Sequence, residues 1–520
     1  MKRLAAIPSN YLFFGLAALA VLMASIDATI VAVAIPALTD AFDAPLTWIG
    51  WTLTAYQLVQ VVMLPLAGKL SDTLGRKRVF LACVGAFTLG SLLCGLAPSI
   101  GFLIAFRALQ ALGGGGLMPS AVGIVSDQFG RKRAQAIGLF TSVFPIGGII
   151  GPNLGGYILH NWSWRELFFL NVPLGIVVLV GVHFLLTEKE HVEGGLSVDW
   201  RGLVLFASAV VALLYGMTEL GNDASLLSSP LLWGLFGASL VLFALFLRHL
   251  LRAADPLVDP ELVIHNPFLA ANLYNFLFGA AAFGFFSFVP YYAVVKYGLT
   301  VFESGAVLTP RAIAMMIVST LASLFIIRFG YRAPMIGGML LVIGSLVLLG
   351  QGWTTASIGD LTIGGFWVLA AIVALSGVGM GLAGPSSNNA ALDLAPTKAA
   401  AISGLRGMFR QTGGVIGIAG VVLALSYFPD QAQGLGLIFF ALAGLLLLAV
   451  PLVFLIPDMA RERHAQAERP AVREAAAAAE RPPATAAHRS APPSVDGAYR
   501  PHSGVYSATS RAAKPWGERK

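Results

Sequence analysis

The stretch Ser71-Asp72-Thr-Leu-Gly75-Arg76-Lys77-Arg78 closes a long apolar run, and nearly the same residues close another run as Ser126-Asp127-Gln-Phe-Gly130-Arg131-Lys132-Arg133. A shorter, diverged copy, Arg328-Phe-Gly330-Tyr-Arg332, ends a third run in the second half of the chain. Charged turns between apolar runs lie outside the hydrocarbon core of a membrane, and their recurrence is typical of duplicated helical bundles. The repeated element therefore predicts a polytopic membrane protein with internal symmetry.

The composition agrees with a membrane protein. Hydrophobic residues make up 57% of the 520 residues and charged residues 11%, against about 45–50% and about 25% in soluble domains. A soluble chain of this length cannot bury so much apolar surface with so little charge outside. Cys83 and Cys94 lie in one apolar run, so we expect buried thiols rather than a disulfide or a metal site.

The net charge of +7 raises nucleic acid as a partner, but its location argues against that. Residues 461–520 carry 11 Lys/Arg and 6 Asp/Glu, so +5 of the charge lies there. This segment is rich in alanine and proline and has no hydrophobic period. We therefore expect a disordered basic tail that faces anionic membrane lipids rather than DNA.

Apolar runs of about 20 residues are long enough to cross the hydrocarbon core. The sequence contains about fourteen of them, at residues 11–38, 48–67, 78–97, 100–125, 134–158, 166–187, 201–220, 231–251, 268–295, 303–327, 333–352, 363–392, 400–427 and 434–456. They group as six, two and six. The sequence thus predicts an all-α fold with four parts: an N-terminal six-helix bundle (1–187), an inserted two-helix segment (188–266), a C-terminal six-helix bundle (267–457) and the tail (458–520).

Lys and Arg in the connections orient these spans, because short cytoplasmic loops of membrane proteins are basic. With the N-terminus inside, two basic residues face outward, Arg165 and Lys296. Fifteen face inward: Lys2, Arg3, Lys69, Arg76, Lys77, Arg78, Arg131, Lys132, Arg133, Lys189, Arg248, Arg252, Arg328, Arg332 and Lys398. Both chain ends are therefore expected in the cytoplasm of a bacterium, with the spans in its inner membrane.

Five motifs in chain order resemble the major facilitator superfamily, in particular its fourteen-span drug:proton antiporter branch. The resemblance covers residues 10 to 457, and the motifs read Ile26-Asp27-Ala-Thr29-Ile-Val-Ala-Val-Ala-Ile-Pro36, Gly68-Lys-Leu-Ser-Asp72-Thr-Leu-Gly75-Arg76-Lys77, Arg107-Ala-Leu-Gln110, Gly147-Gly-Ile-Ile-Gly151-Pro152-Asn-Leu-Gly155-Gly156, and Trp162-Ser-Trp164-Arg165 through Asn171-Val-Pro173-Leu-Gly175. Two positions depart from the family pattern, since Thr73 stands where a base is frequent and Ala111 where a glycine is usual. The resemblance implies the major-facilitator fold, two pseudo-symmetric six-helix bundles joined by two inserted helices.

The resemblance also implies roles for two of these motifs. In the loop between spans 2 and 3, Asp72 acts as a conformational latch together with Gly68, Gly75, Arg76 and Lys77, whereas the alternative is a solvated charge paired loosely with Arg76. The span 5 motif is the antiporter motif. Its glycines at 147, 151 and 155 share one helix face and allow close helix contact, Gly156 follows directly, and Pro152 loosens the helix.

Burying a charged side chain inside a membrane span costs free energy, so such residues mark functional sites. Asp27 lies deep in span 1, where burial favours the protonated carboxyl and a nearby cation such as Arg107 favours the ionised one. We interpret the pair as the proton-coupling site. The alternatives are a static buried ion pair, or a carboxylate that binds a cationic drug directly.

The second half carries Arg311, Arg406 and Arg410 within or at the edge of spans. Arg311 is expected to line a cavity, whereas Arg406 lies close enough to the cytoplasmic end for its side chain to snorkel. The candidate substrate cavity is lined by polar and aromatic side chains, which suit lipophilic ligands: Gln57, Gln110, Arg311, Phe285, Tyr291 and Asn388.

The sequence therefore predicts a proton-coupled antiporter that exports lipophilic small molecules, cationic drugs among the candidates. A dedicated exporter of one endogenous metabolite or lipid is the alternative within transport. A membrane enzyme or receptor is disfavoured, because the sequence contains no metal-ligand cluster, nucleophile motif or nucleotide loop. No cofactor is expected beyond the proton gradient. Relatives in this branch work alone or with a periplasmic adaptor and an outer-membrane channel, and the sequence leaves both arrangements open.

Overall fold

The computed structural model describes residues 9–129, 136, 139–140, 143–185, 199–253, 256, 258–358, 361–395 and 398–459. All of these belong to the first of two compact units, Met1–Gln466. The second unit, Ala467–Lys520, lies outside the described residues, and so does nearly all of the expected disordered tail.

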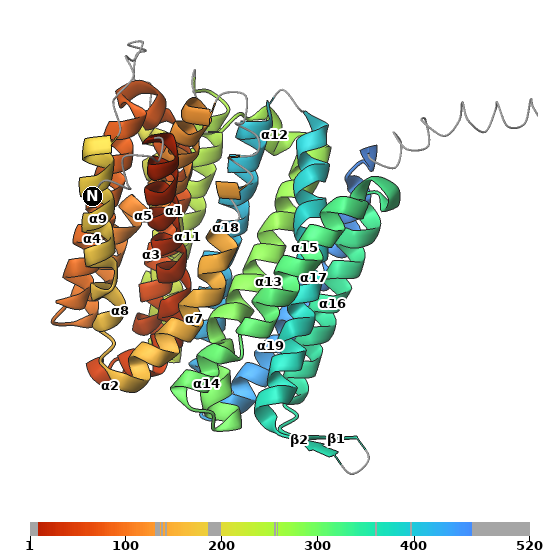
Figure 1. The fold of residues 1–520 in the computed structure, drawn as a ribbon. Helices are drawn as coiled ribbons and strands as arrows, with labels where there is room; N and C mark the ends of the chain where they lie inside the picture. Colours follow the sequence, from red (N-terminus) through yellow and green to blue (C-terminus); the bar gives the residue numbers. More distant parts are fainter. Residues whose placement is uncertain are drawn as a thin grey trace, which may run out of the picture. The chain divides into compact units, whose positions relative to one another are not determined.

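Long helices side by side form the first unit (Figure 1). Those of the first half are α1 (Ser9–Ile30), the 3₁₀ turn η2 (Val31–Ala34), α2 (Ile35–Phe42), α3 (Leu46–Leu74), α4 (Arg76–Gly95), α5 (Ile100–Phe129), α7 (Val143–Asn161), α8 (Glu166–Phe169) and α9 (Asn171–Leu185). The inserted segment contains α10 (Trp200–Asn222), the 3₁₀ turn η4 (Ala224–Ser228), α11 (Pro230–Leu250) and α12 (Glu261–Ile264).

The second half repeats the pattern of long helices. It contains α13 (Asn266–Tyr297), α14 (Val301–Ala306), α15 (Thr309–Phe329), α16 (Arg332–Gln351), α17 (Gly365–Leu394), α18 (Ala399–Leu425), α19 (Gln431–Leu447) and α20 (Val450–Leu455). A hairpin of two three-residue strands, β1 (Ala356–Ile358) and β2 (Leu361–Ile363), adds to the expected helices, with Ala356 opposite Ile363.

Twelve stretches of the described residues are long and apolar enough to cross a membrane, and each coincides with one of the fourteen expected spans. The polytopic helical class is therefore confirmed. The expected second and fifth spans coincide with α3 and α7, helices of 29 and 19 residues that are not among the twelve. Expected span 5 begins at 134, and part of it lies outside the described residues.

Local breaks in the spans have identifiable causes. The first span changes from α1 through the 3₁₀ turn Val31–Ala34 into α2, which carries Pro36 in its first turn, where a missing N–H is tolerated. The tenth span likewise breaks between α14 and α15. Its entry is fixed by a capping box in which Thr300 and Glu303 bond each other's backbone N–H groups.

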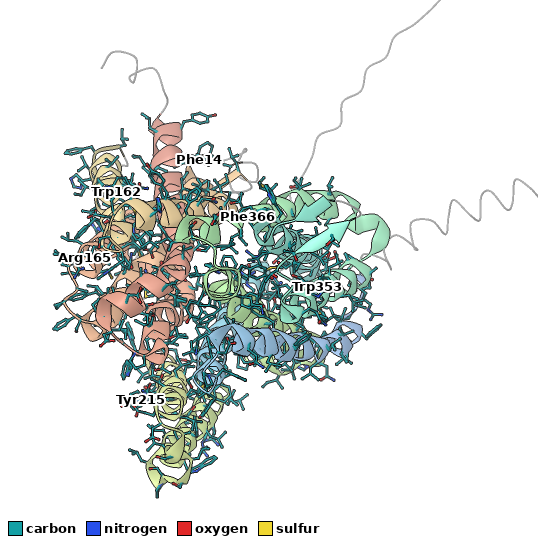
Figure 2. The ribbon with its side chains drawn as sticks, turned by 90° about the horizontal axis from the view of Figure 1, so that it is seen from below. Phe14, Trp162, Arg165, Tyr215, Trp353 and Phe366 are labelled. Atoms are coloured by element: carbon teal, nitrogen blue, oxygen red, sulfur yellow. The ribbon has the colours of Figure 1, made fainter. Side chains whose placement is uncertain are left out.

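The helices form two groups with the inserted pair beside them. Seen from below in Figure 2, Trp162 and Arg165 mark the first half and Trp353 and Phe366 the second half, while Tyr215 marks the inserted pair. Helix α10 packs on α11, α18 and α3, and the Trp51 indole N–H donates to the Thr218 hydroxyl at 2.8 Å. The insert is thus attached to both halves.

The short elements separate the two ends of the helices. Helices α2 and α14 and the β hairpin lie at one end, and α12 lies toward the other (Figure 1). In the orientation predicted from the basic residues, α12 lies on the cytoplasmic side, and α2, α14 and the hairpin lie on the outer side. At the α12 end, the Lys398 ammonium binds Glu261 at 2.6 Å and Asp259 at 2.9 Å, and these carboxylates raise the pKa of Lys398 to about 12.

Candidate functional site

Asp27 is the centre of a closed polar network in the first half. Its Oδ2 accepts from Arg107 Nη1 at 2.7 Å, and its Oδ1 accepts from Gln110 Nε2 at 2.8 Å and from Asn171 Nδ2 at 3.1 Å. The carboxylate lies on α1, the guanidinium and the amide of Gln110 on α5, and Asn171 begins α9. Asp27 has 0% and Arg107 1% of its surface exposed. The pair predicted from the sequence is therefore an ion pair inside the protein.

Arg107 makes further contacts with Thr52, Gln110 and Tyr56. Its Nε donates to the Thr52 carbonyl oxygen at 3.1 Å, Nη1 also donates to Gln110 Oε1 at 2.6 Å, and the guanidinium lies 4.0 Å from the centre of the Tyr56 ring. A buried ion pair compensates its loss of hydration only when the other hydrogen-bonding atoms are also satisfied. In this network both carboxylate oxygens of Asp27 and the Nε and Nη1 atoms of Arg107 have partners, which offsets part of that loss.

The sequence identified three members of the network and missed the others. Gln110 was expected to line the substrate cavity and instead bonds Asp27, while its amide also donates to the Ser91 hydroxyl at 2.7 Å. Asn171 and Tyr56 were not singled out, although an asparagine at the start of an apolar run is a signal that sequence reading can use. Their contacts cross from one helix to another, so spacing along the chain does not predict them.

The glycine face of α7 packs against the turn of α1 that carries Asp27. A Cβ on Gly147 would lie 2.5 Å from the Ser25 Cβ, one on Gly151 would overlap the Thr29 hydroxyl, and one on Gly155 would lie 2.7 Å from the Ile30 Cγ1. Such close approaches exclude any side chain at these three positions of α7. The antiporter-motif glycines and the titratable carboxylate thus form one structural assembly, which the sequence presented as two separate motifs.

The other side of α7 contacts the second half through α14. A Cβ on Gly305 would overlap the Pro152 carbonyl oxygen, and one on Gly156 would lie 3.0 Å from the Phe302 Cα. Asn153 Nδ2 also donates to the Thr309 hydroxyl at 2.5 Å. Both halves therefore touch at the α2 and α14 end, where the glycine contacts bring backbone against backbone and the Asn153–Thr309 hydrogen bond adds a side-chain contact.

The signature loop is shorter than expected, because α3 continues through Leu74 and only Gly75, with φ at 103°, separates it from α4. Gly68 and Asp72 belong to the last turns of α3 rather than to a loop, and the side chain of Asp72 lies outside the described ones. Arg76 Nη1 donates to the Gly123 carbonyl oxygen at 2.6 Å and pairs with Asp127 at 2.8 Å, and Lys77 donates to the His183 carbonyl oxygen at 2.9 Å. The bases therefore join α4 to the ends of α5 and α9.

The diverged copy of this motif in the second half, residues 328–332, makes equivalent contacts with different residues. The Asp458 carboxylate accepts from the backbone N–H groups of Tyr331 at 2.8 Å and Arg332 at 3.3 Å, and so caps the N-terminus of α16. Arg332 donates to the carbonyl oxygens of Phe454 and Ile456, and the Tyr331 hydroxyl donates to Asp393 at 2.5 Å. Asp458 was expected to begin the disordered tail, and this prediction is wrong for that residue, which is 7% exposed.

Arg311 and Arg406 lie inside the second half. Arg311 is 8% exposed, its Nη2 lies 3.1 Å from the Met380 sulfur, and its guanidinium lies 4.1 Å from the centre of the Phe286 ring. Arg406 was expected to snorkel, but it is 9% exposed and its Nη atoms donate to Asn275, Ser387 and Asn388. The snorkelling prediction is wrong, because three acceptors inside the protein hold the guanidinium there.

The other expected cavity residues divide between core and partly open positions. Phe285 is fully buried and packs edge-on against Phe439 of α19, with ring centres 6.2 Å apart, so it belongs to the packed core. Tyr291 is half-buried, and Gln57 is half-buried with an Oε1 that has no hydrogen-bond partner. A separate apolar cavity of about 560 Å³ lies between α10, α11, α13 and α18, lined by Phe206, Phe243, Val263, Phe276 and Met408 among others.

A helical membrane protein built of two repeated bundles, with a buried ion pair inside the first, has the build of a transporter. Comparison with known proteins agrees: the sequence profile of the Major Facilitator Superfamily matches residues 17–418 and 271–500. The chain is 31% identical over 402 residues to the multidrug transporter protein MdtP of Bacillus subtilis (strain 168), covering 77% of this chain and 72% of that one. It is 31% identical over 426 residues to the tetracenomycin C resistance and export protein of Streptomyces glaucescens, covering 80% and 76%.

Solved structures give the same fold. A bacterial homolog to the human lysosomal transporter Spinster, in an inward-facing and unoccupied conformation, superposes with a TM-score of 0.60 at 17% identity, covering 86% of this chain and 97% of that one. The fold and the polar site thus define a multi-pass membrane transporter of small molecules rather than an enzyme. The chain belongs to the Major Facilitator Superfamily.

Proposed function

We propose that this protein exports lipophilic small molecules across a bacterial inner membrane in exchange for protons, by alternating access. Relatives named as multidrug transporters and resistance proteins support a drug-like substrate. The proposal counts α3 and α7 as spans, which makes fourteen, and places both chain ends in the cytoplasm. The unequal distribution of Lys and Arg supports this orientation.

The observation that carries the proposal is the contact between the Asp27 network and the glycine face of α7. Protonation of Asp27 removes the ion pair with Arg107 and weakens the bonds that hold α1 to α5 and α9. The same turn of α1 packs against Gly147 and Gly151, and α7 in turn contacts α14 of the other half. A proton on Asp27 therefore changes the packing that joins the two halves.

The state described here is closed at the α2 and α14 end, the proposed outer face. The contacts of Pro152 with Gly305 and of Gly156 with Phe302 leave no space for a side chain there. In the proposed cycle, substrate is taken up from the cytoplasmic side while Asp27 is ionised. Outward opening then exposes Asp27 to the more acidic outer face, where it takes a proton and the substrate leaves.

Everted membrane vesicles test the proposal. A pH gradient is generated and followed with a pH-sensitive dye, and neutral, cationic and anionic lipophilic compounds are added in turn. Wild-type vesicles should lose part of the gradient on addition of a substrate, and Asp27→Asn vesicles should not. Glu303→Gln is the matched control, because Glu303 caps an exposed turn away from the network.

Removal of one member of a buried ion pair costs about 3–5 kcal/mol and can unfold a protein. Membrane level and thermal unfolding are therefore measured in parallel, and the double variant Asp27→Asn/Arg107→Gln removes the orphaned charge. Equal proton exchange in wild type and a folded Asp27→Asn protein would overturn the assignment. Loss of exchange in Glu303→Gln, or in a parallel Asp393→Asn variant, with exchange retained in Asp27→Asn, would move the proton site to that carboxylate.

A further inference from the structure

The interior of the second half carries positive charge that no carboxylate compensates. Residues 267–457 contain four carboxylates: Glu303, Asp393 and Asp430 lie in connections or at helix ends, and Asp360 lies outside the described residues. Arg311, Arg406 and Arg410 lie within helices, and in the described part of the chain no carboxylate oxygen lies within 4.0 Å of them. In the first half, by contrast, Asp27 neutralises Arg107.

Arg311 lacks oxygen acceptors in the described structure. Its hydrogen-bond partner there is the Met380 sulfur, a weak acceptor, and its buried Nε has no partner. A guanidinium has five N–H donors in a planar fork that matches a carboxylate, sulfonate or phosphate. Gly377 packs on the Arg311 backbone 12 residues into α17, about 18 Å along that helix, so this unsatisfied group lies deep between the ends of the spans.

Arg406 and Arg410 continue the positive charge along the same bundle. They are four residues apart on α18, so their side chains leave the same face of the helix. Arg406 donates to three neutral side chains and keeps a buried Nε without a partner, and the Arg410 side chain is exposed. Their neighbours on α13, Asn275 and Gly279, are 11 and 7 residues from Phe286, or about 16 and about 10 Å.

We propose that the C-terminal half binds the anionic group of the exported compound, between Arg311 and the Arg406–Arg410 pair. This inference rests on the proposed export function and names its substrate class as lipophilic organic anions, such as arylsulfonates and arylcarboxylates. Buried unpaired guanidinium groups are costly, and an anion supplies both the missing charge and the missing acceptors. In the described structure Asp27 is engaged by Arg107, Gln110 and Asn171, so its carboxylate is not free to bind a cation.

Aromatic side chains beside the arginines suit the apolar part of such a ligand. Phe286 lies against the Arg311 guanidinium, and Tyr274 and Phe278, which precede Asn275 by one residue and follow it by three, stack with ring centres 5.8 Å apart. A flat aromatic body packs on such rings, and its anionic group reaches the guanidinium donors. The site thus distinguishes an anion from its neutral analogue by charge and from a simple ion by its aromatic surface.

Binding to the purified full-length protein in nanodiscs tests this with matched probes. Naphthalene-2-sulfonate is compared with neutral naphthalene-2-sulfonamide and with sodium chloride alone, by calorimetry and thermal unfolding. We expect the sulfonate to bind at least tenfold more tightly than the sulfonamide, and Arg311→Gln to remove that preference. Arg311→Lys should restore part of it, because a lysine keeps the charge and loses the fork.

Arg410→Gln keeps the test decisive where the Arg311 variants fail to fold, because the Arg410 side chain is exposed and is not part of the hydrogen-bond network of Arg406. It should weaken sulfonate binding severalfold, whereas Arg165→Gln, at the outer face, should leave the affinity unchanged. Equal affinity for sulfonate and sulfonamide would overturn the inference. Stabilisation by chloride alone, with no arginine-dependent sulfonate binding, would also overturn it and leave a counterion site.

These outcomes are separable from failure of the export proposal. Arginine-dependent sulfonate binding without proton exchange in vesicles would refute proton-coupled export and keep the anion site. Proton exchange that depends on Asp27 and is driven by cations alone would keep export and refute the anion site.

Discussion

Gly305→Ala should open this transporter at the α2 and α14 end, the proposed outer face. The added Cβ would lie 2.9 Å from the Pro152 carbonyl carbon and nearer still to its oxygen, whereas carbon atoms pack at about 3.5–4.0 Å. Helices α14 and α7 therefore have to separate by roughly 1 Å. The opposing group is backbone, so no side-chain rotation relieves the overlap, and the state closed at this end is destabilised.

Overpacking of this kind costs about 1–3 kcal/mol, which changes the ratio of two conformations by about 5- to 150-fold. The cost falls on the closed state alone when the α7–α14 contact opens in the alternative state. Alanine favours a helix by about 1 kcal/mol over glycine. Helix propensity therefore cannot produce the expected destabilisation, because it acts in the opposite direction. Gly148→Ala on α7 is the matched control, because its Cβ would meet no atom within 4 Å.

Spin-label distances across the outer face provide the assay. Labels are attached at Asn161→Cys and Lys296→Cys, exposed positions at the outer ends of α7 and α13, after replacement of Cys83 and Cys94 by serine. Gly305→Ala should add a population at longer distance, and Gly148→Ala should reproduce the parent distribution. Identical distributions in both variants, from folded protein, would show that the α7–α14 contact does not hold the outer face closed.

Four further outcomes follow from the same structure. Gly151→Leu should reduce export far more than membrane level, because a side chain there overlaps the Thr29 hydroxyl beside Asp27; normal export from this variant, assayed with protein level in the same cells, would contradict the role of this packing. Asp458→Ala should lower the stability measured by thermal unfolding in detergent by about 1–2 kcal/mol, the usual cost of a lost helix cap, and an unchanged midpoint would show that the cap is dispensable. The pKa of Lys398 is raised, so its ion pairs with Glu261 and Asp259 stabilise the fold below the pKa of an unfolded lysine, and this contribution is lost as the pH rises through about 12. Lys398→Ala should therefore leave the pH dependence of the unfolding midpoint between pH 6 and 9 unchanged. A new slope in that range would refute this account of the Lys398 ion pairs. Deletion of residues 465–520 should leave membrane level and export nearly intact, and failure of the truncated protein to accumulate would assign the tail a structural role.

The class of fold could be predicted from the sequence because the bilayer constrains it strongly. Apolar runs of fixed length, basic connections and the repeated turn at Asp72 and Asp127 are one-dimensional features, and a membrane turns each of them directly into structure. The expected spans coincide with observed helices for the same reason. The pairing of Asp27 with Arg107 also followed from the sequence, since two opposite charges deep in apolar helices have few other partners.

Which partners surround each polar group was decided only by the tertiary structure. Asn171 reaches Asp27 across 144 positions of the chain, Asp458 caps a helix that begins 126 positions earlier, and Arg406 turns inward to Asn275. An apolar sequence places a helix across the membrane but does not determine the helix's rotation about its own axis, because lipid and protein interior are equally apolar surroundings. Close contacts such as Gly305 against Pro152 fix that rotation, and so they decide that Phe285 packs into the core and that Arg311 has no oxygen acceptor among the described residues.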